Sequence, residues 1–474
     1  MRSGLRERGA ILVVSCYELG RQPVAVATAL AELAFAGFEP AALDVAVDPI
    51  DDEALRAARL IAISVPMHTA LRLGVRVADR ARAVNPSAHV CLFGLYAALN
   101  REHLLERHCD SIAGGEADEP VRLLAEQLDL GGPGRLEQPI PGIATRTHPE
   151  LTAPRKSSRK PSLPVRSSLP ALDRYARLDG GGGAGEGKLV AAVEATRGCL
   201  HLCRHCPIVP VYRGRFVAVP RETVLGDIEQ QVRAGAEHVT FGDPDFLNGP
   251  THALKLVQEL HSRWPGLTFD ATIKIEHLLR HRALLPELAT AGCLFITSAV
   301  ESLNDRVLQA LDKGHSAADV PLALRLVRAA GIDLRPTLLP YPPWTELSDL
   351  PALFDFAEEH NLDEQIEPVQ YTLRLLIPPG SAVLELPGEK PWLREERSDE
   401  FGWAWRHPDA RVDALWEESS ALAQAHAQAG RDASTALSEL RALAVRAAGS
   451  SRARPERAPR QRRSIPRLTE PWFC

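Results

Sequence analysis

Three cysteines stand within one short segment of the chain, at Cys199, Cys203 and Cys206. Thiolate sulfurs are soft ligands, and three of them in one loop suit either an iron–sulfur cluster or a zinc ion. A structural zinc site takes four ligands, and His201 or His205 of the same loop would supply the fourth. Without a fourth protein ligand, one iron of a 4Fe–4S cluster stays open. The triplet therefore predicts a metal centre.

Strand and helix patterns alternate from residue 188 onward, and they place the triplet directly after a buried strand. Short apolar runs predict the strands, and apolar residues at three- and four-residue spacing predict the helices between them. Six such repeats predict a partial (β/α)6 TIM-type barrel over residues 188–385, followed by a helical region over 386–450. The expected strands span residues 190–198, 238–244, 267–274, 294–302, 333–342 and 367–378.

A C-x3-C-x2-C motif after the first strand of a parallel α/β region resembles the radical S-adenosylmethionine (SAM) superfamily. The resemblance implies that the three cysteines hold a 4Fe–4S cluster and that the open iron binds the amine and carboxylate of SAM. It also implies reductive cleavage of SAM to methionine and a 5'-deoxyadenosyl radical, which removes a hydrogen atom from the substrate. The partners that follow are a reductant such as a flavodoxin or ferredoxin and an unknown small-molecule or peptide substrate.

Two further motifs carry this resemblance. Gly242, Asp243 and Pro244 stand at the end of the second expected strand, where the family has a Gly-Gly-Glu-like stretch that contacts the SAM amine through its backbone. Glu301 lies in a Ser-Ala-Val-Glu-Ser segment that resembles the family's fourth-strand Gly-x-Glu-Ser. That likeness implies that Glu301 faces the barrel mouth and touches SAM. The alternative is that Glu301 caps the next helix.

Charged residues inside expected strands need partners. Arg374 lies within an apolar strand, where its guanidinium would bind a carboxylate of SAM or substrate, or else pair with a carboxylate of the core. Lys274 and Glu276 share one face of the third expected strand by its period of two. They would point into the barrel or form a salt bridge with each other.

Residues 1–135 show a separate alternation of strand and helix patterns. It predicts a doubly wound parallel, Rossmann-like domain, in which ligands sit beyond the carboxyl ends of the strands. The region ends in a Gly-Gly-Glu-Ala-Asp-Glu segment and resembles the cobalamin-binding domain of many radical SAM enzymes. The expected strands span residues 10–16, 41–47, 60–66, 88–94 and 110–115.

The cobalamin assignment leaves alternatives open. The Asp-x-His-x-x-Gly signature that supplies a cobalt ligand in one class of cobalamin proteins is absent, and His68 is the only substitute in this region. One reading is a cobalamin-assisted methyl transfer or rearrangement. Another is a radical SAM enzyme whose first domain is a scaffold without a cofactor. A third is a non-catalytic zinc or iron–sulfur protein.

The remaining segments have a different composition. Residues 136–187 are rich in Pro, Ser and Gly and predict a mobile linker, with a docked piece at 169–178 as an alternative. Residues 451–474 form a basic tail that we expect to be disordered. Its terminal Cys474 resembles the CUAEP/CCAEP-tail radical SAM group, which implies a selenoprotein truncated at this position. The alternative is an incidental terminal thiol.

The composition is that of a globular protein. The chain has 474 residues, a net charge of −6 and eight cysteines, which are too few for a disulfide scaffold at this length. The mild negative charge gives no reason to expect nucleic acid as a partner. No apolar run approaches the roughly 20 residues that span a membrane, so we expect a cytoplasmic protein.

Overall fold

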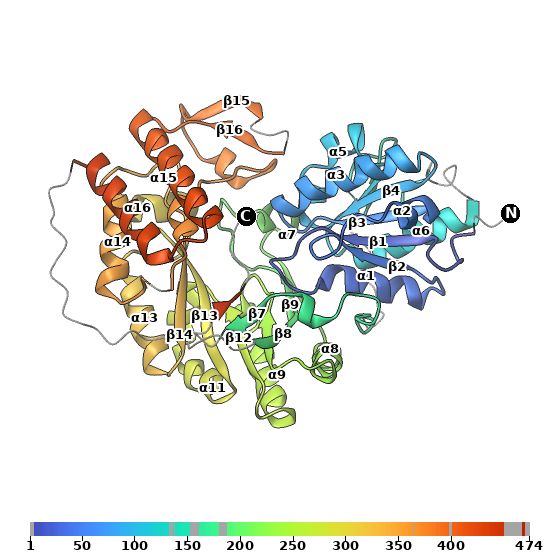
Figure 1. Ribbon diagram of the computed structural model, residues 1–474, viewed down its shortest axis with the longest axis horizontal. Coiled ribbons are helices and arrows are strands. Elements are labelled where there is room, and N and C mark those ends of the chain that lie inside the picture. Colours follow the sequence, from blue (N-terminus) through green and yellow to red (C-terminus); the bar gives the residue numbers. More distant parts are fainter. Residues whose placement is uncertain are drawn as a thin grey trace.

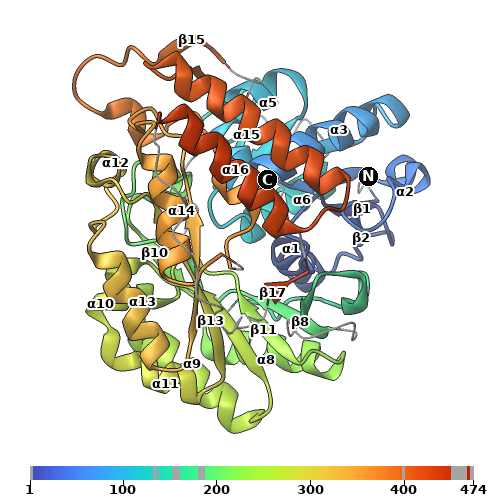
Figure 2. The same ribbon diagram turned by 60° about the vertical axis from the view of Figure 1, so that its left-hand side comes forward.

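The computed structural model describes residues 4–131, 136, 138–151, 161–179, 187–363, 365–397, 401–449 and 467–469. Two α/β parts lie side by side, and a mainly helical part lies against the second of them (Figure 1). The same arrangement is seen after rotation, with the barrel strands below the C-terminal helices (Figure 2). The expectation of two consecutive α/β regions is thus confirmed.

The first part is a six-stranded sheet in the order β2-β1-β3-β4-β5-β6. Its first five strands are parallel, as expected, and β6 runs antiparallel to β5. Every residue of β1, β3, β4 and β5 is buried because helices cover both faces. The strands are β1 (Ile11–Ser15), β2 (Ala41–Asp44), β3 (Leu60–Ser64), β4 (His89–Phe93), β5 (Ser111–Ala113) and β6 (Ile143–Thr145).

Two separate hydrophobic clusters lie on the two faces of this sheet. One face packs against α1 and α6, and the other packs against α2, α3, α4 and α5. Alternate residues of one strand enter opposite clusters, as Val13 and Val14 of β1 do. The helices are α1 (Val24–Phe35), α2 (Asp52–Ala57), α3 (His68–Val84), α4 (Leu95–Leu99), α5 (Arg101–Arg107) and α6 (Asp118–Gly131).

The second part is a curved seven-stranded sheet in the order β14-β13-β12-β11-β8-β7-β17. The five strands from β8 to β14 are parallel, and β7 and β17 extend the sheet antiparallel beyond β8. They are β7 (Arg177–Asp179), β8 (Lys188–Val193), β11 (His238–Phe241), β12 (Thr268–Thr272), β13 (Cys293–Glu301), β14 (Asp333–Leu338) and β17 (Arg467–Leu468).

The sixth barrel strand that the sequence predicts is reduced to one isolated parallel bridge between Tyr341 and Arg374. The residues before the bridge form the 3-10 helix η5 (Pro368–Thr372) instead of a strand. Pro368 has no N–H to donate to a ladder, and the backbone N–H of Leu338 at the end of β14 donates to the side chain of Gln370 (3.0 Å). The edge of β14 is therefore satisfied by a side chain.

Helices cover the outside of the curved sheet (Figure 1). Apart from α12, whose Val307 and Leu311 belong to another cluster, they share one hydrophobic cluster with α15 and α16, so the barrel and the C-terminal helices form one core. They are α8 (Arg221–Arg233), α9 (Pro250–Arg263), α10 (Ile275–Arg280), α11 (Leu285–Thr290), α12 (Asp305–Leu311), α13 (Asp319–Ala329) and α14 (Asp349–Glu359), followed by α15 (Ala410–Gln428) and α16 (Ala433–Ala447).

Short elements complete the barrel region. A two-stranded pair of β9 (Thr196–Gly198) and β10 (Phe216–Ala218) encloses α7 (Ile208–Tyr212). A second antiparallel pair, β15 (Leu393–Arg397) and β16 (Trp403–Trp405), precedes the C-terminal helices. The region expected to be mainly helical therefore also contains an antiparallel strand pair, whose tryptophans pack into a small apolar cluster with Val307 and Leu311 of α12.

The mobile linker expected over residues 136–187 is wrong where the structure describes that segment. Strand β6 completes the first sheet, and β7 pairs with β8. Leu172 and Leu178 are buried, and the buried guanidinium of Arg166 pairs with Asp227 of α8 (2.7 Å), so this stretch has the apolar area and ion pairing to be ordered. The glycine run at 180–186 lies outside the described residues.

Part of the basic tail is also ordered, contrary to expectation. Arg467 and Leu468 pair with β7, and the backbone N–H of Thr469 donates to the carbonyl of Arg177 (2.8 Å). The free edge of β7 explains this pairing, since an unpaired strand offers a row of backbone donors and acceptors. Cys474, which carries the selenoprotein hypothesis, lies outside the described residues.

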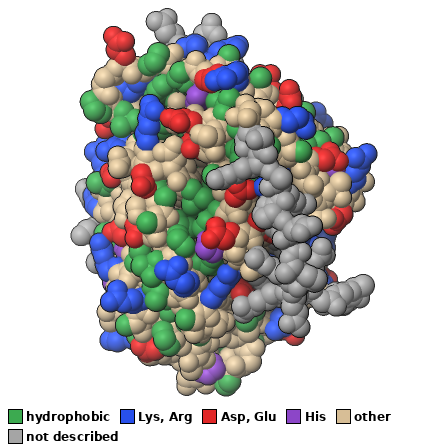
Figure 3. All heavy atoms as spheres, turned by 90° about the vertical axis from the view of Figure 1, so that its left-hand side faces the viewer, with side chains coloured by type: hydrophobic (Ala, Val, Ile, Leu, Met, Phe, Trp, Pro, Cys, Tyr) green, Lys and Arg blue, Asp and Glu red, His purple; other side chains and the backbone are tan. Residues whose placement is uncertain are grey.

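The face that lies on the left of Figure 1 is seen in Figure 3. Positive and negative side chains are interspersed on it around a band of hydrophobic ones, so the described side chains of this face form no basic field for a polyanion (Figure 3). Among the helices that the structure describes, none combines the length and the apolar character needed to span a bilayer.

Candidate metal and cofactor site

The cysteine loop begins directly after β9 and is fixed at its start by Asn248. The Asn248 side chain accepts a hydrogen bond from the backbone N–H of Leu200 (3.1 Å) and donates one to the carbonyl of Gly198 (3.3 Å). Cys199 and Cys203 are buried, and Cys206 is half-buried. One amide side chain beyond β11 thus holds the loop that the sequence identifies as a metal-binding segment.

The middle of the loop is fixed by Arg204. Its backbone N–H donates to the carbonyl of Leu311 (2.9 Å), and its guanidinium donates to the carbonyls of Gln309 (2.9 Å) and Ala310 (3.1 Å). These carbonyls end helix α12, where a cation satisfies unpaired acceptors and complements the helix dipole. The hydroxyl of Ser381 donates to the carbonyl of Arg204 (3.2 Å) from the opposite direction.

Gly198 sets the backbone direction just before Cys199. Its φ of +78° lies in the left-handed region, which favours glycine. A Cβ built on it would lie 2.5 Å from the carbonyl oxygen of Arg215 and 2.4 Å from the Tyr212 ring. Glycine is therefore required here both for its conformation and for the close approach of the following turn.

The three sulfurs are near one another, yet they are not gathered as the ligands of one ion would be. The Cys199 and Cys203 thiols both raise the pKa of Cys206, after burial, which raises it most, to about 12. A tetrahedral zinc site places its sulfurs about 3.8 Å apart. Among the described residues the triplet does not form a group whose donors all lie within 4.8 Å. Three thiols in one loop are the ligand set of an iron–sulfur cluster that keeps one iron without a protein ligand.

Thiols must lose their protons to bind a metal. Burial raises the pKa of Cys199 to about 11, and the cation of Lys313 lowers that of Cys206 against the larger effect of burial. Without a metal these groups are therefore neutral thiols at pH 7. Binding of a metal or cluster would release their protons, and Lys313 is placed to stabilise the resulting negative charge.

Glu301 ends β13 and faces the cysteine loop. Its carboxylate pairs with Lys313 (3.1 Å) and lies 3.3 Å from Nε2 of His205, which stands between Cys203 and Cys206. Burial opposes ionisation, but Lys313 and His205 hold the pKa of Glu301 well below its usual range. The helix-cap alternative is wrong, because Asn304 caps α12 by accepting from the N–H of Arg306 (2.9 Å).

Asp243 lies at the end of β11, between the strands that frame the loop. Its carboxylate accepts hydrogen bonds from the backbone N–H of Ala195 (2.9 Å) and from the hydroxyl of Thr196 (2.6 Å). Burial raises its pKa to about 7. The neighbouring Gly242 donates its N–H to the carbonyl of Val193 (2.7 Å). The side chain of Asp243 thus joins β11 to the chain after β8, and the Gly242–Pro244 backbone remains the part expected to meet SAM.

Arg374 pairs with a carboxylate of the protein, which was the second of the two roles expected from the sequence. Its guanidinium pairs with Asp413 of α15 (2.9 Å) and donates to the carbonyl of Trp405 (2.9 Å). It also lies 3.9 Å from the ring centroid of Trp405 and 4.5 Å from that of Trp416. These contacts use the guanidinium of Arg374 within the C-terminal region, so a role for Arg374 as a ligand of SAM is not supported.

Lys274 and Glu276 do not share a strand, contrary to expectation. Strand β12 ends at Thr272, and the chain turns at Lys274 (φ −63°, ψ 146°) into helix α10. The two side chains still pair, with 3.3 Å between Lys274 Nζ and Glu276 Oε2. Their salt bridge, which was the alternative from the sequence, is thus present in a different local structure.

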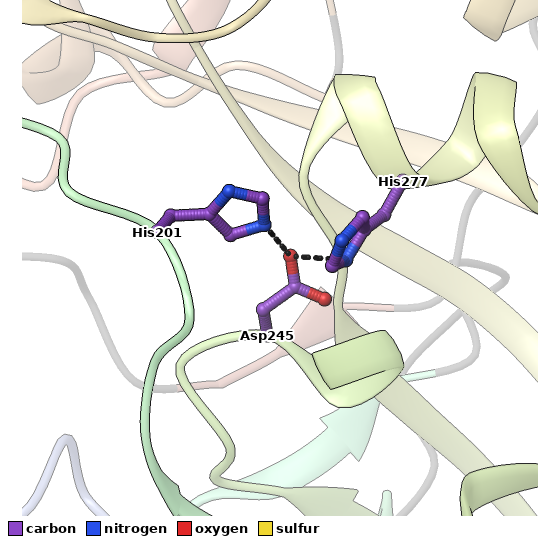
Figure 4. A group of neighbouring side chains, drawn as sticks. All are labelled: His201, Asp245 and His277. Carbon is purple, nitrogen blue, oxygen red and sulfur yellow. Dashed lines mark ion pairs between the residues drawn. The ribbon is translucent and has the colours of Figure 1, made fainter. Parts of the chain in front are cut away.

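A cluster that the sequence analysis missed lies beside the cysteine loop (Figure 4). His201 of the loop, Asp245 after β11 and His277 of α10 offer donor atoms that all lie within 4.8 Å of one another. Asp245 and His277 are buried, and His201 is half-buried. Spacing along the chain gives no signal for this cluster, because its members come from three separate β/α connections.

The carboxyl edge of the first sheet faces the same loop. Helix α4 contacts α7, which follows Cys206. The hydroxyl of Tyr212 donates to Glu116 (2.8 Å), and Arg197 pairs with both Glu116 (3.0 Å) and Asp118 (2.6 Å). His68 lies on this edge, with its ring centroid 6.0 Å from that of Tyr96. The expected ligand-binding edge of the first domain therefore adjoins the cysteine loop.

Comparison with known proteins identifies the second part of the chain. Residues 193–356 match the family model of the radical SAM superfamily. The chain contains a radical SAM domain. The cysteine triplet, Gly242, Asp243, Pro244 and Glu301 lie inside the matched region, whereas Arg374 and His68 lie outside it. This match confirms the recognition of the superfamily from the cysteine motif. Radical SAM proteins bind a 4Fe–4S cluster and SAM.

Relatives of the radical SAM domain include tRNA-2-methylthio-N(6)-dimethylallyladenosine synthases. The protein of Pseudomonas paraeruginosa is 26% identical over 259 residues, which cover 51% of this chain and 54% of the relative. The protein of Pseudomonas aeruginosa is 27% identical over 199 residues, which cover 39% of this chain and 42% of the relative. The chain thus spans about half the length of the curated relatives that it matches.

Solved structures share the fold over a longer stretch. The radical SAM methyltransferase TsrM from Kitasatospora setae, with cobalamin and a 4Fe–4S cluster bound, aligns with a TM-score of 0.64 at 16% identity and covers 82% of this chain and 81% of its own. The cobalamin-dependent radical SAM enzyme OxsB aligns with a TM-score of 0.65 at 15% identity, covering 86% and 66%. The fold of a Rossmann-like part joined to a radical SAM domain is thereby confirmed.

Proposed function

We propose that the protein is a radical SAM enzyme in which Cys199, Cys203 and Cys206 hold a 4Fe–4S cluster. The observation that carries the proposal is the cysteine loop itself. Three thiols stand on one anchored loop of the radical SAM domain, and two of them are buried. Three ligands leave one iron of the cluster open for SAM.

A 4Fe–4S cluster held by Cys199, Cys203 and Cys206 would supply the one electron that reductive cleavage of SAM needs. The chain's own residues position and shield this chemistry. Asn248 and Arg204 hold the loop at two points, and Lys313 places a positive charge beside the sulfurs. A cation near a cluster favours its more negative, reduced state.

Glu301 and the Gly242–Pro244 backbone are proposed to orient SAM. Glu301 is held by Lys313 and His205, so its carboxylate has a fixed direction beside the loop. Asp243 fixes the end of β11 through its two hydrogen bonds, which presents the neighbouring carbonyls at the barrel mouth. Both groups lie at the carboxyl ends of parallel strands, where barrel enzymes place their sites.

The reaction proposed for this enzyme is assisted by cobalamin, which would bind between the first sheet and the cysteine loop. The fold likeness to TsrM and OxsB supports it, and so does the contact of α4 with α7. The reaction is a methyl transfer or a rearrangement on a small-molecule or peptide substrate. A flavodoxin- or ferredoxin-type protein is the proposed electron donor.

Retention of cobalamin tests this part of the proposal. Protein purified from cells supplied with hydroxocobalamin is expected to carry about one cobalamin per chain. His68→Ala is expected to retain it, because no cobalt-ligand signature accompanies His68. If the wild type carries no cobalamin after this supplement, the alternative of a scaffold domain without a cofactor is correct.

Cleavage of SAM tests the enzyme assignment. Anaerobically reconstituted protein with dithionite is expected to form 5'-deoxyadenosine, and Cys203→Ala is expected to lose both cluster iron and this product. Cys293→Ala is the matched control, since Cys293 is a buried cysteine of β13 outside the loop. If Cys203→Ala retains cluster and product, the assignment of the ligands is wrong.

A further inference from the structure

We propose that His201, Asp245 and His277 form a second metal site, separate from the cysteine triplet, for a divalent first-row transition ion such as Zn²⁺. Two imidazoles and one carboxylate are a ligand set that such ions favour over Mg²⁺ or Ca²⁺. The argument for this site rests on the geometry of these three side chains and does not depend on the proposed enzyme activity.

The distances fit one ion. The Oδ2 atom of Asp245 lies 3.1 Å from Nδ1 of His277 and 3.6 Å from Nε2 of His201 (Figure 4). Nitrogen and oxygen ligands that lie about 2.05 Å from a tetrahedral zinc ion are about 3.3 Å apart. The two distances from Asp245 fall on either side of this value, and the donor nitrogens of His201 and His277 lie within 4.8 Å of each other. Small rotations of the rings would complete the triangle.

The carboxylate is fixed in advance by the backbone. Oδ1 of Asp245 accepts from the N–H of Leu247 (2.9 Å), and Oδ2 accepts from the N–H of Lys274 (3.2 Å). A carboxylate oxygen has two lone pairs, so Oδ2 retains one that points toward the histidines. Asp245 has no exposed surface, and a buried carboxylate held in this way is a preorganised ligand.

The two histidine nitrogens that face Asp245 make no hydrogen bond to any other group that the structure describes. Nδ1 of His277 and Nε2 of His201 are buried and make no hydrogen bond, although each faces Asp245. The His277 side chain is 4% exposed, and its Nδ1 lies 3.1 Å from Asp245 without a hydrogen bond, so a bound ion would satisfy a buried polar atom. A metal ion would satisfy both nitrogens together.

Glu276 lies beside the ring nitrogen of His201 that does not face Asp245. Its Oε2 lies 3.5 Å from Nδ1 of His201, the ring nitrogen opposite the proposed ligand atom. A carboxylate that accepts from the far nitrogen of a histidine fixes the ring and its tautomer in many metal sites. Glu276 also pairs with Lys274 (3.3 Å) and Arg280 (2.7 Å), so these cations are compensated and do not face the ion alone.

Three protein ligands leave at least one coordination position open. Closed structural zinc sites have four protein ligands, whereas sites with three keep a position for water or a reactant. His201 stands between Cys199 and Cys203, so an ion bound there would tie the cysteine loop to α10. The site is therefore placed to couple its occupancy to the position of the loop.

Zinc binding by the reconstituted full-length protein tests the proposal. Samples whose iron and sulfide contents show a complete cluster are dialysed against Zn²⁺, and bound zinc is measured by mass spectrometry. The wild type is expected to bind one Zn²⁺ per chain. His277→Phe, which keeps an aromatic ring against His201, is expected to weaken binding more than tenfold at unchanged iron content.

A matched control and a second variant keep the test independent of folding. His281 follows one turn later on the same segment, with its ring 5.3 Å from that of His277, but it is no member of the donor group. His281→Phe is therefore expected to bind zinc as the wild type does. Glu276→Gln keeps all three ligands and is expected to weaken binding about 10- to 100-fold.

The ligands of the bound zinc decide between this site and the cysteines. X-ray absorption at the zinc edge is expected to show nitrogen and oxygen neighbours at about 2.0–2.1 Å and no sulfur. Sulfur neighbours at about 2.3 Å would place the zinc on the thiols and overturn the proposal. So would wild type without bound zinc, or His277→Phe that binds it as tightly as the wild type.

Discussion

At the residue scale, Glu301 and Lys313 show how the site holds a buried charge. Neither side chain is more than 11% exposed, and each is the other's main compensation. The sequence identifies Glu301 through its motif, but it gives no reason to pair it with Lys313. Glu301 ends β13 in the left-handed region (φ +64°), and Lys313 follows the end of α12, so the pair is brought together only in the folded chain.

Replacing Lys313 is expected to destabilise the protein strongly. Lys313→Met leaves the Glu301 carboxylate buried without its cation, which costs about 3–5 kcal/mol in comparable buried pairs. Urea denaturation measures the change in the free energy of unfolding. The double variant Glu301→Gln with Lys313→Met is expected to recover part of the loss. Equal stability of Lys313→Met and the wild type would show that the pair is not buried in solution.

Gly198 carries a separate prediction about the cysteine loop. Gly198→Ala places a Cβ against a backbone carbonyl that has little room to move, so we expect a large loss of stability and of cluster content. Gly388→Ala is the control, because Gly388 has a similar φ of +88° with nothing within 4 Å. Gly388→Ala is expected to lower the free energy of unfolding only by the backbone strain, about 1–2 kcal/mol. Similar losses in both variants would contradict the role of the close contact.

Glu18 predicts a pH dependence of stability. It follows β1, and burial, with a smaller effect of Glu194, raises its pKa to about 8, while the N–H of Val24 donates to it (2.9 Å). An acid with a raised pKa in the folded state binds more protons when folded, so stability falls as pH rises from about 4.5 to about 8. Glu18→Gln is expected to flatten this dependence in urea denaturation. Identical slopes for both proteins would contradict it.

At the scale of elements, the connection between the two sheets depends on Arg197 of β9. This residue pairs with Glu194, Glu116 and Asp118, so one cation joins the barrel to the start of α6. Its side chain is 19% exposed, which leaves the three carboxylates poorly solvated if it is removed. No periodicity in the sequence predicts this network, because its members lie in two different domains.

Arg197→Met is expected to destabilise the protein by about 3 kcal/mol, at the low end for a buried pair that loses one partner. The control is Arg233→Met, whose side chain is 74% exposed and pairs with Glu229 on the same helix. That change is expected to stay within about 0.5 kcal/mol. Thermal or urea unfolding of both variants measures the difference. If they lose the same stability, Arg197 does not join the two parts.

The elements themselves could largely be predicted from the sequence. The five apolar runs of residues 1–135 became the five parallel strands of the first sheet, because a strand buried on both faces needs a continuous apolar run. The run at 367–378 was also expected to be a strand, but it includes Pro368, Gln370 and Arg374, and it forms η5 and a single bridge. Its proline and the side chain of Gln370 decide that outcome, and both act through contacts that a local pattern does not contain.

At the scale of the whole molecule, the two α/β parts act as one framework around the cysteine loop. The first sheet presents its carboxyl edge to α7, and the C-terminal helices share the barrel's core. The sequence located the cysteines because their spacing is local. It could not locate the group of His201, Asp245 and His277, because three separate connections bring those residues together only in the folded chain.

The proposed chemistry requires that three cysteines hold a cluster with one iron open to SAM. Electron paramagnetic resonance of the anaerobically reconstituted and reduced protein examines that iron. We expect the signal of a reduced 4Fe–4S cluster that changes when SAM is added, because SAM binds the open iron. A protein without iron, or a cluster signal that SAM leaves unchanged, would contradict it.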